Sequence, residues 1–472
     1  MPRQGDGQTN SEATPLLGSS TLGSLAPEIA NSKQGWQPWE DNRAWVAYPW
    51  SFLHKTWQVL ISSPVNILLV FVPAGIVCGA IGANPTVVFV LNFLAIIPLA
   101  ALLSFATEEI SVKLGQTLGG LMNATFGNAV ELIVSVPASS LCAEAPFGDR
   151  IRIGKNTDKK PQVSIVALKN GEIRIVQASM LGSILSNILL VLGCCFIAGG
   201  LNPANPKEQT FNSTVASTMS SLMAVATASL IIPATLYAAL PNPNHSDAGD
   251  KKILLLSHGT SIILLILYVM YLYFQLKSHK ELFDEEQQTE GGDGAEQEPA
   301  ILSPWAAGVA LVLVTVVVAV CAEYLVDSID SIVQTAHISK TFIGLVLLPI
   351  VGNAAEHVTA CVVAYKNKMD LAIGVAIGSS MQIALFVTPF LVILGWIIGQ
   401  PMTLHFQMFE TVVFFVSVLV VNYLIQDGKS NYLEGAMCLG TYIIIALAFY
   451  VYPDNAGDKP GPGLGMLFGG GN

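Results

Sequence analysis

The sequence predicts an all-α polytopic membrane protein with eleven transmembrane helices: one N-terminal helix followed by two inverted five-helix repeats. Of its 472 residues, 52% are hydrophobic and only 12% are charged, about half the charged fraction of a soluble domain. The apolar residues gather in runs of about 20, the length that crosses the hydrocarbon core of a bilayer as a helix. A polar motif inside one of these runs recurs in the second half of the chain.

Residues 1–60 are rich in Ser, Gly and Pro, and we interpret them as a disordered tail. Because the first apolar run begins so far into the chain, we expect no cleavable signal peptide. An acidic segment, 277–300, separates the sixth and seventh runs, and residues 454–472 form a C-terminal tail. The eleven predicted spans are 63–82, 86–106, 116–140, 176–200, 214–239, 252–275, 302–323, 340–365, 370–397, 406–426 and 432–452.

The third and eighth spans carry the recurring motif. Residues 127–131 read GNAVE and residues 352–357 read GNAAEH. In both halves the following span contains a patch of small polar residues, and the preceding span ends in acids. Because each repeat has an odd number of spans, the two repeats must be inverted relative to each other. The expected divisions are 61–84 for the extra first helix, 85–276 for the first repeat and 301–453 for the second.

Glu131 and Glu356 lie near the middle of their spans. A carboxylate at this depth costs several kcal/mol unless it serves a polar site, so we expect both to be functional. Carboxylate, amide, hydroxyl and carbonyl oxygens are the ligands that Ca²⁺ prefers. Hydrogen bonding between helices is the alternative role for the polar residues of the following spans. The predicted metal ligands are Glu131, Glu356, Gly127, Asn128, Gly352, Asn353, Ser183, Asn187, Ser379 and Gln382.

Two facing carboxylates without a cation would repel each other, so protonation is the natural alternative to metal binding. A site that holds either Ca²⁺ or protons, but not both, has the chemistry of an antiporter. His357, beside Glu356, could carry a proton because an imidazole titrates near neutrality. A hydrogen-bonded polar residue with no transport role is the alternative for His357.

The other acids each have two interpretations. Four of them lie at span ends, where they either form the mouths of an ion pathway or are interface residues. Residues 281–298 contain eight acids and no Lys or Arg, which is typical of a solvated loop. A regulatory segment is the alternative there. The mouth residues are Glu108, Glu109, Glu323 and Asp327, and the regulatory candidates are Asp284, Glu285 and Glu286.

These motifs resemble the cation/proton exchanger (CAX) family of the Ca²⁺/cation antiporter superfamily, in particular its fungal vacuolar Ca²⁺/H⁺ exchangers. GNAVELIVS and GNAAEHVTA are similar to the two signature repeats of that family. IRIVQASMLGSILSNILLVLG and LAIGVAIGSSMQIALF are similar to its flanking helices.

This resemblance implies eleven helices, a cytosolic N-terminus, inverted repeats, and Ca²⁺ uptake into the vacuole driven by proton efflux. It also implies that Glu131 and Glu356 bind Ca²⁺ and H⁺ alternately and that His357 is the signature histidine of the family. Residues 281–298 match an acidic cytosolic segment that attracts Ca²⁺ in that family.

One segment departs from the family pattern. Residues 137–164 are polar and basic, and they stand between the third and fourth spans, where the family has almost no insertion. With a cytosolic N-terminus, Lys and Arg divide equally between the two sides of the membrane, without the usual cytosolic excess. Leaving the segment out restores that excess, so we expect an insertion or a translated intron here.

Several alternatives to Ca²⁺/H⁺ exchange follow from the same residues. Exchange of Mn²⁺ or a monovalent cation for H⁺ fits the same fold, since oxygen ligands do not separate Ca²⁺ from Mn²⁺. A cation channel is disfavoured because the acids occur in paired repeats rather than in a ring around an oligomer axis. No HExxH or GxSxG motif indicates an enzyme. We expect no cofactor besides the transported ions and no nucleic-acid partner, and the oligomeric state stays open.

Overall fold

The computed structural model describes residues 54–59, 64–114, 173–239, 247–279, 281, 302–336 and 338–452. The chain divides into two compact units, Met1–Val59 and Leu60–Asn472. In the first unit, residues 54–59 are helical. All elements below belong to the second unit. The predicted span 116–140 and the segment 137–164 lie outside the described residues, as does nearly all of the acidic segment.

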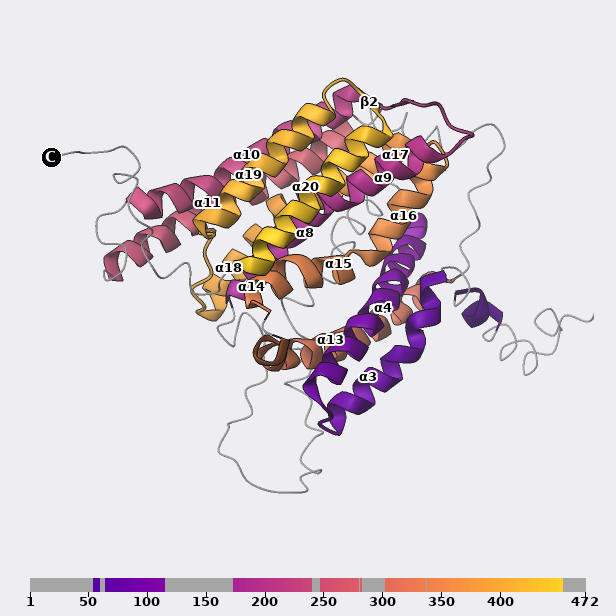
Figure 1. The fold of residues 1–472 in the computed structure, drawn as a ribbon, viewed down its shortest axis with the longest axis vertical. Coiled ribbons are helices and arrows are strands. Elements are labelled where there is room, and N and C mark those ends of the chain that lie inside the picture. The colour runs from indigo at the N-terminus through magenta and orange to yellow at the C-terminus, as the bar shows by residue number, and fades with distance from the viewer. Residues whose placement is uncertain are drawn as a thin grey trace, which may run out of the picture. The chain divides into compact units, whose positions relative to one another are not determined.

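The second unit is built almost entirely of helices (Figure 1). Its first part contains η3 (Pro64–Val70), α3 (Phe71–Ala80), α4 (Pro85–Leu114), α8 (Ile173–Leu185), η5 (Ser186–Val191), α9 (Leu192–Leu201), β1 (Gln209–Thr210), α10 (Ser213–Ala239), α11 (Asp247–Tyr273) and η6 (Phe274–Ser278). Its second part contains α13 (Pro304–Ala336), α14 (Lys340–Phe342), η7 (Ile343–Leu347), α15 (Leu348–Gly352), α16 (Ala354–Tyr365), α17 (Met369–Gln382), η8 (Ile383–Val387), α18 (Thr388–Ile398), α19 (Met408–Leu424), β2 (Lys429–Ser430) and α20 (Tyr432–Val451).

Seven of the described helices are long and apolar enough to cross a membrane. An eighth span results if the bent pair Lys340–Gly352 and Glu356–Tyr365 is counted as one. Two shorter apolar helices, Val65–Ala80 and Met408–Leu424, fall on further predicted spans. The expectation of a helical, multi-spanning membrane protein is therefore confirmed.

α4 and α13 pack along each other, with α3 against α4 (Figure 1). The pair is joined by small and aliphatic residues such as Ala95, Leu103, Val318 and Leu325, all almost completely buried. Together with neighbouring residues these form a hydrophobic cluster of their own. α4 and α13 are the first helices of the two predicted repeats.

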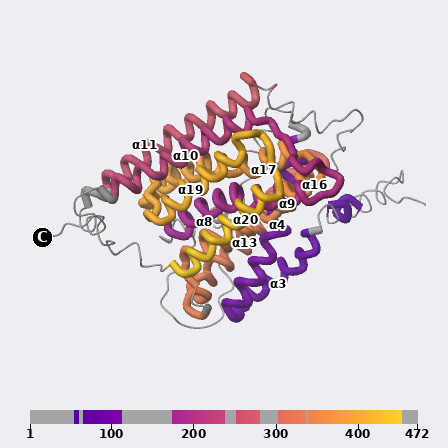
Figure 2. Tube along the Cα trace, turned by 45° about the horizontal axis from the view of Figure 1, so that its top comes forward, coloured from indigo at the N-terminus to yellow at the C-terminus, as the bar shows by residue number. Residues whose placement is uncertain are grey.

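A second and larger hydrophobic cluster joins α8, η5 and α9 to α10, α11 and the helices from α16 to α20. α8 lies at its centre, since every residue from Ile175 to Leu185 is buried. α10 and α11 run side by side at the edge of this cluster (Figure 2). α11 exposes large apolar side chains such as Ile263 and Val269, as expected of a lipid-facing helix.

Both the fourth and the ninth predicted spans contain a π-helical segment, which the sequence analysis did not anticipate. η5 begins at Ser186 inside the first small polar patch, and η8 follows directly after Gln382 at the end of the second patch. π-helical turns inside α-helices are frequent at functional sites. The two segments begin at similar positions in the two spans, η5 four residues after Gly182 and η8 five residues after Gly378.

The connection between α9 and α10 packs against the end of α16. The Asn202 side chain donates to the Tyr365 carbonyl at 2.7 Å, and Gln209 donates to the Ala364 carbonyl at 3.3 Å and to Asn367 Oδ1 at 2.8 Å. Asn367 itself has a positive φ of 62°. These side chains add hydrogen bonds to carbonyl groups of the last helical turn, including that of Ala364, which also accepts the Asn367 N–H at 3.0 Å.

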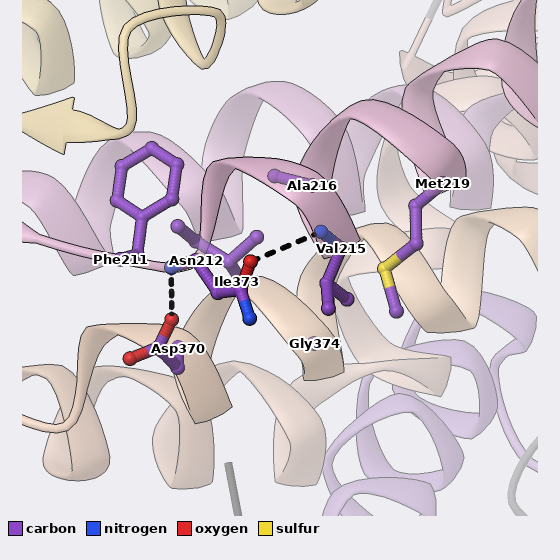
Figure 3. A pocket seen from close by; sticks show the side chains of 8 residues that line it. All are labelled: Phe211, Asn212, Val215, Ala216, Met219, Asp370, Ile373 and Gly374. Atoms are coloured by element: carbon purple, nitrogen blue, oxygen red, sulfur yellow. Dashed lines mark hydrogen bonds between the residues drawn. The ribbon is translucent and has the colours of Figure 1, made fainter. Parts of the chain in front are cut away.

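The start of α10 is fixed to α17 in a similar way (Figure 3). Asp370 accepts a hydrogen bond of 2.6 Å from the backbone N–H of Asn212. The Asn212 side chain in turn accepts from the Val215 N–H at 3.3 Å. Together with the antiparallel pair of β1 and β2, these bonds tie the two halves of the chain together at one end of the bundle.

Gly182 marks the closest approach between α8 and η7. A Cβ atom added at Gly182 would lie 2.1 Å from the Leu345 carbonyl oxygen, and backbone atoms cannot move aside cheaply. We expect Gly182→Ala to destabilise the protein by about 1–3 kcal/mol or more, the usual cost of overpacking. Thermal unfolding of the purified protein in detergent measures this effect.

Gly259→Ala is the matched control, because a Cβ atom at this exposed α11 position meets nothing within 4 Å. It should be neutral or slightly stabilising, since Ala favours helix by about 1 kcal/mol over Gly. Equal midpoints for the two variants would contradict the proposed close contact.

Candidate functional site

A polar cavity of about 460 Å³ lies between α4, α10, α11, η6, α16 and α17. Among the described lining residues the acids are Glu356 on α16 and Glu108 on α4. Its described lining consists of Ser104, Glu108, Ser111, Met219, Tyr271, Gln275, Glu356, Thr359, Leu371, Gly374, Val375, Gly378, Ser379 and Gln382.

Glu356 is positioned by a break in its span. α15 ends at Gly352, α16 begins at Ala354, and the two flanking helical segments are bent by 58°. Asn353 stands between them with φ −94° and ψ 5°, outside helical geometry. Glu356 therefore lies in the first turn of α16, where the positive end of the helix dipole favours a negative charge. A half-helix N-terminus inside the membrane is a recurrent ion-site device in transporters.

The polar patches of the fourth and ninth spans meet beside Glu356. The Asn187 side chain donates to Ser379 Oγ at 3.1 Å, and Ser379 in turn hydrogen-bonds to the Glu356 carboxylate. At the same crossing, Ser380 donates to the Ile184 carbonyl at 3.4 Å. The structure thus brings two residues of the predicted ligand set, Asn187 and Ser379, together beside the Glu356 carboxylate.

Two of the residues joined here each keep a buried oxygen atom that has no hydrogen-bond partner within the described part of the chain. They are Asn187 Oδ1 and Glu356 Oε2, and Ser183 Oγ, one helical turn before Asn187, is a third such atom. A buried polar atom without a partner costs about 1–3 kcal/mol, so these atoms call for a ligand or ordered water. A carboxylate, an amide and a hydroxyl oxygen together suit a hard cation. Among all the residues that the structure describes, no group of three or more His, Cys, Asp or Glu side chains could hold a metal ion.

His357 points to a different neighbour. Its Nε2 atom lies 3.3 Å from Ser186 Oγ, the first residue of η5. The histidine is therefore hydrogen-bonded to the interrupted fourth span, next to the carboxylate that precedes it. This contact agrees with either sequence interpretation of His357.

The remaining predicted residues fall into separate places. Glu108 and Gln382 line the cavity, whereas Glu109 turns away and accepts a 2.8 Å bond from the Leu302 N–H. Glu323 is half-buried and Asp327 exposed on α13. Gly352 ends α15. The predicted residues outside the described part of the chain are Gly127, Asn128, Glu131, Asp284, Glu285 and Glu286.

Several lining residues on α4 and α11 were not predicted from the sequence. Ser104 lies four residues before the predicted Glu108 and Ser111 three residues after it, so both share its helix face. Tyr271 and Gln275 are four residues apart and do the same on α11 and η6. This spacing was available in the sequence, but single Ser and Gln residues in apolar runs are commonly packing residues.

A bundle of apolar helices with a carboxylate-based polar cavity in its interior defines a membrane transporter of the ion-exchanging type. The sodium/calcium exchanger protein family matches residues 162–277 and 306–451. The chain belongs to this family.

Individual relatives agree with the family match. A vacuolar calcium ion transporter of Schizosaccharomyces pombe is 48% identical over 94% of each chain. Vacuolar cation/proton exchanger 3 of Oryza sativa subsp. japonica is 41% identical, covering 84% of this chain and 88% of its own length. The crystal structure of the Ca²⁺/H⁺ antiporter protein YfkE has a TM-score of 0.62 at 34% identity, covering 82% of this chain and 99% of its own.

Asn187 offers a direct test of the oxygen cluster. In Asn187→Ala the Oδ1 atom and the bond to Ser379 are both lost, so a hard divalent cation should stabilise this variant much less than the wild type. For a ligand at about one hundred times its Kd the expected stabilisation is about 2.7 kcal/mol. Thermal unfolding with increasing Ca²⁺ measures it.

Asn92→Ala is the control, because Asn92 is equally buried but bonds to Gly75 and Val88 in the α3–α4 pair. It should unfold at a lower temperature yet keep the full Ca²⁺-dependent shift. A full shift in Asn187→Ala would remove that residue from the cation site.

Proposed function

We propose that this protein is a vacuolar Ca²⁺/H⁺ antiporter that moves cytosolic Ca²⁺ into an acidic lumen in exchange for protons. The observation that supports it most is the set of unpartnered oxygens around Glu356 beside a polar cavity. The names of its relatives, which transport calcium or exchange cations for protons in vacuoles, point to the same pair of ions.

The transported ions compete for the same carboxylates. Ca²⁺ enters past Glu108 and is held by deprotonated Glu356 and by Glu131, its counterpart in the first repeat. Ser183, Asn187 and Ser379 supply further oxygens. Protonation from the acidic lumen removes the negative charge of the carboxylates and releases Ca²⁺. The site therefore holds either protons or Ca²⁺, but not both at once. No cofactor is needed for this exchange, and no enzymatic step is involved.

We propose that alternating access uses the fact that the cavity wall is shared between the two hydrophobic clusters. α4 belongs to one hydrophobic cluster, while α10, α11, α16 and α17 belong to the other. Sliding of the α4–α13 pair against the rest would change which end of the cavity is open, because packed elements slide as units. Glu323 and Asp327 on α13 would form the lumenal mouth and Glu108 the cytosolic one.

The architecture proposed for the whole chain has eleven spans and a cytosolic N-terminus. Residues 61–84 form the extra helix, and inverted repeats occupy 85–276 and 301–453. The pairing of α4 with α13 and the matched π-helical segments support this arrangement. Glu131, Gly127 and Asn128 would then mirror Glu356, Gly352 and Asn353 across the site. We propose the acidic segment 277–300 as the cytosolic Ca²⁺-attracting region.

Exchange of Mn²⁺ or a monovalent cation for H⁺ is the alternative on the same fold. Oxygen ligands accept Mn²⁺ as well as Ca²⁺. Competition by each cation against Ca²⁺ uptake separates these possibilities.

Glu356 and Glu131 are the decisive residues for transport. In Glu356→Gln and in Glu131→Gln the amide can neither bind a proton nor hold a divalent cation strongly. We expect Ca²⁺ uptake into acidified vesicles to fall at least about tenfold in each variant, equivalent to 1.4 kcal/mol or more. Ca²⁺-dependent fluorescence in sealed vesicles measures the uptake.

Glu208→Gln is the control, because Glu208 is exposed, pairs with Lys429 at 3.5 Å, and is not among the lining residues of the cavity. It should transport like the wild type. Collapse of the pH gradient should stop uptake in both. Uptake that persists without the gradient would show a channel, and substantial uptake by either cavity variant would exclude that acid from the central role.

The segment 137–164 provides a further test. If it is an insertion or a translated intron, a chain lacking these residues should express and transport Ca²⁺ at least as well as the full chain. Sequencing of the transcript identifies its origin. A message that contains these codons, with transport lost on deletion, would show that the segment belongs to the working protein.

A further inference from the structure

A second cavity, separate from the ion cavity, lies where α10 ends and α11 begins. Its volume is about 470 Å³, and its polar lining residues are Tyr237, Lys251, Thr403 and His405. Tyr237 is the last residue of one candidate membrane span and Lys251 the first residue of the next. The cavity therefore opens at the boundary of the apolar zone, the level at which lipid headgroups lie.

The lining of this cavity offers hydrogen-bond donors and a positive charge. Lys251 contributes an ammonium group, and Tyr237 contributes a hydroxyl. Thr403 contributes a second hydroxyl, whose Oγ1 accepts the backbone N–H of His405 at 3.3 Å. The rings of His405 and Tyr237 contact each other with centroids 4.2 Å apart and planes tilted by 36°. No carboxylate is among the described lining residues, and this combination suits an anion such as a phosphate group.

The loop that carries Thr403 and His405 is held firmly from behind. Gln177, buried in α8, donates to the Thr403 carbonyl at 2.9 Å and to the His405 carbonyl at 3.2 Å. Ser257, buried in α11, accepts the Leu404 N–H at 3.0 Å. Binding groups that are fixed before the ligand arrives lose less entropy on binding.

Glu410, the acid on the helix that follows this loop, is already neutralised. Glu410, completely buried at the start of α19, forms a 2.6 Å ion pair with Arg174 of α8. It also accepts the Gln407 N–H at 3.1 Å. Its charge is thus balanced by an arginine and does not oppose an anion beside Lys251.

The walls and surroundings of the cavity are apolar. Ile253, Leu254 and Pro401 complete its lining. Beside it, Leu255 of α11 and Ile397 of α18 expose 73% and 76% of their surface. A free phosphate ion gains nothing from such surfaces, whereas the acyl chains of a lipid would cover them.

We propose that this cavity binds the phosphate headgroup of an anionic phospholipid, with its acyl chains along α11 and α18. Lys251, Tyr237, Thr403 and His405 hold the phosphate oxygens. α11 also contributes Tyr271 to the ion cavity, so a lipid at this position contacts a helix that the transported ion passes. The proposal does not depend on which cation the protein transports.

Thermal unfolding of the purified full chain in detergent tests this site. Short-chain phosphatidic acid should raise the unfolding midpoint, while short-chain phosphatidylcholine and inorganic phosphate should not. In Lys251→Ala the half-saturating concentration of phosphatidic acid should rise at least about tenfold. Thr403→Val, which keeps the shape of the side chain but removes the hydroxyl, should weaken binding in the same direction.

Lys252→Ala is the matched control, because Lys252 is an exposed neighbour with the same charge that does not line the cavity. It should bind phosphatidic acid like the wild type. Equal losses in Lys251→Ala and Lys252→Ala would indicate diffuse attraction to the surface and overturn the proposal. The proposal is also overturned if inorganic phosphate raises the unfolding midpoint as much as phosphatidic acid does, or if neither compound raises it.

Discussion

A carboxylate inside an apolar bundle must be neutralised by a proton or coordinated by a cation, and the described site is arranged around this constraint at Glu356. The bend between α15 and α16 places the acid at a helix N-terminus. The crossing of the fourth and ninth spans then surrounds it with hydroxyl and amide groups. Without the break, the dipole of an uninterrupted helix would offer the carboxylate no terminus at this depth.

Two π-helical segments lie directly beside these polar groups. η5 begins at Ser186, which contacts His357, and Asn187, which contacts Ser379, is the next residue. The same irregularity in η8 follows Gln382 in the cavity wall. Irregular backbone is tolerated at membrane depth where it lines a polar site.

The two hydrophobic clusters divide the bundle into two separately packed groups of helices. The α4–α13 pair has its own core, and the larger cluster is further tied together by the hydrogen bonds of Gln209, Asn202 and Asp370. The ion cavity lies where these clusters meet. The second cavity, by contrast, is lined by the end of α10, the start of α11 and the loop that carries Thr403 and His405. It lies at the edge of the apolar zone.

The amino-acid sequence by itself determined the class of fold and singled out Glu356 as a candidate site residue. Apolar runs long enough to span a membrane and a recurring GNxxE motif report directly on the cost of burying charge, which does not depend on tertiary detail. Glu356, Asn187 and Ser379 could therefore be selected from spacing and residue type.

Only the tertiary structure decided which neighbouring residues share the site. Glu108 lines the cavity while Glu109 bonds to Leu302, although the two are adjacent in sequence, because consecutive helical residues point in directions about 100° apart. No local pattern in the sequence predicted the π-helical segments. Tyr271 and Gln275 line the cavity together with residues of α4, α16 and α17, and this depends on distant parts of the chain meeting, which is a property of the packed bundle.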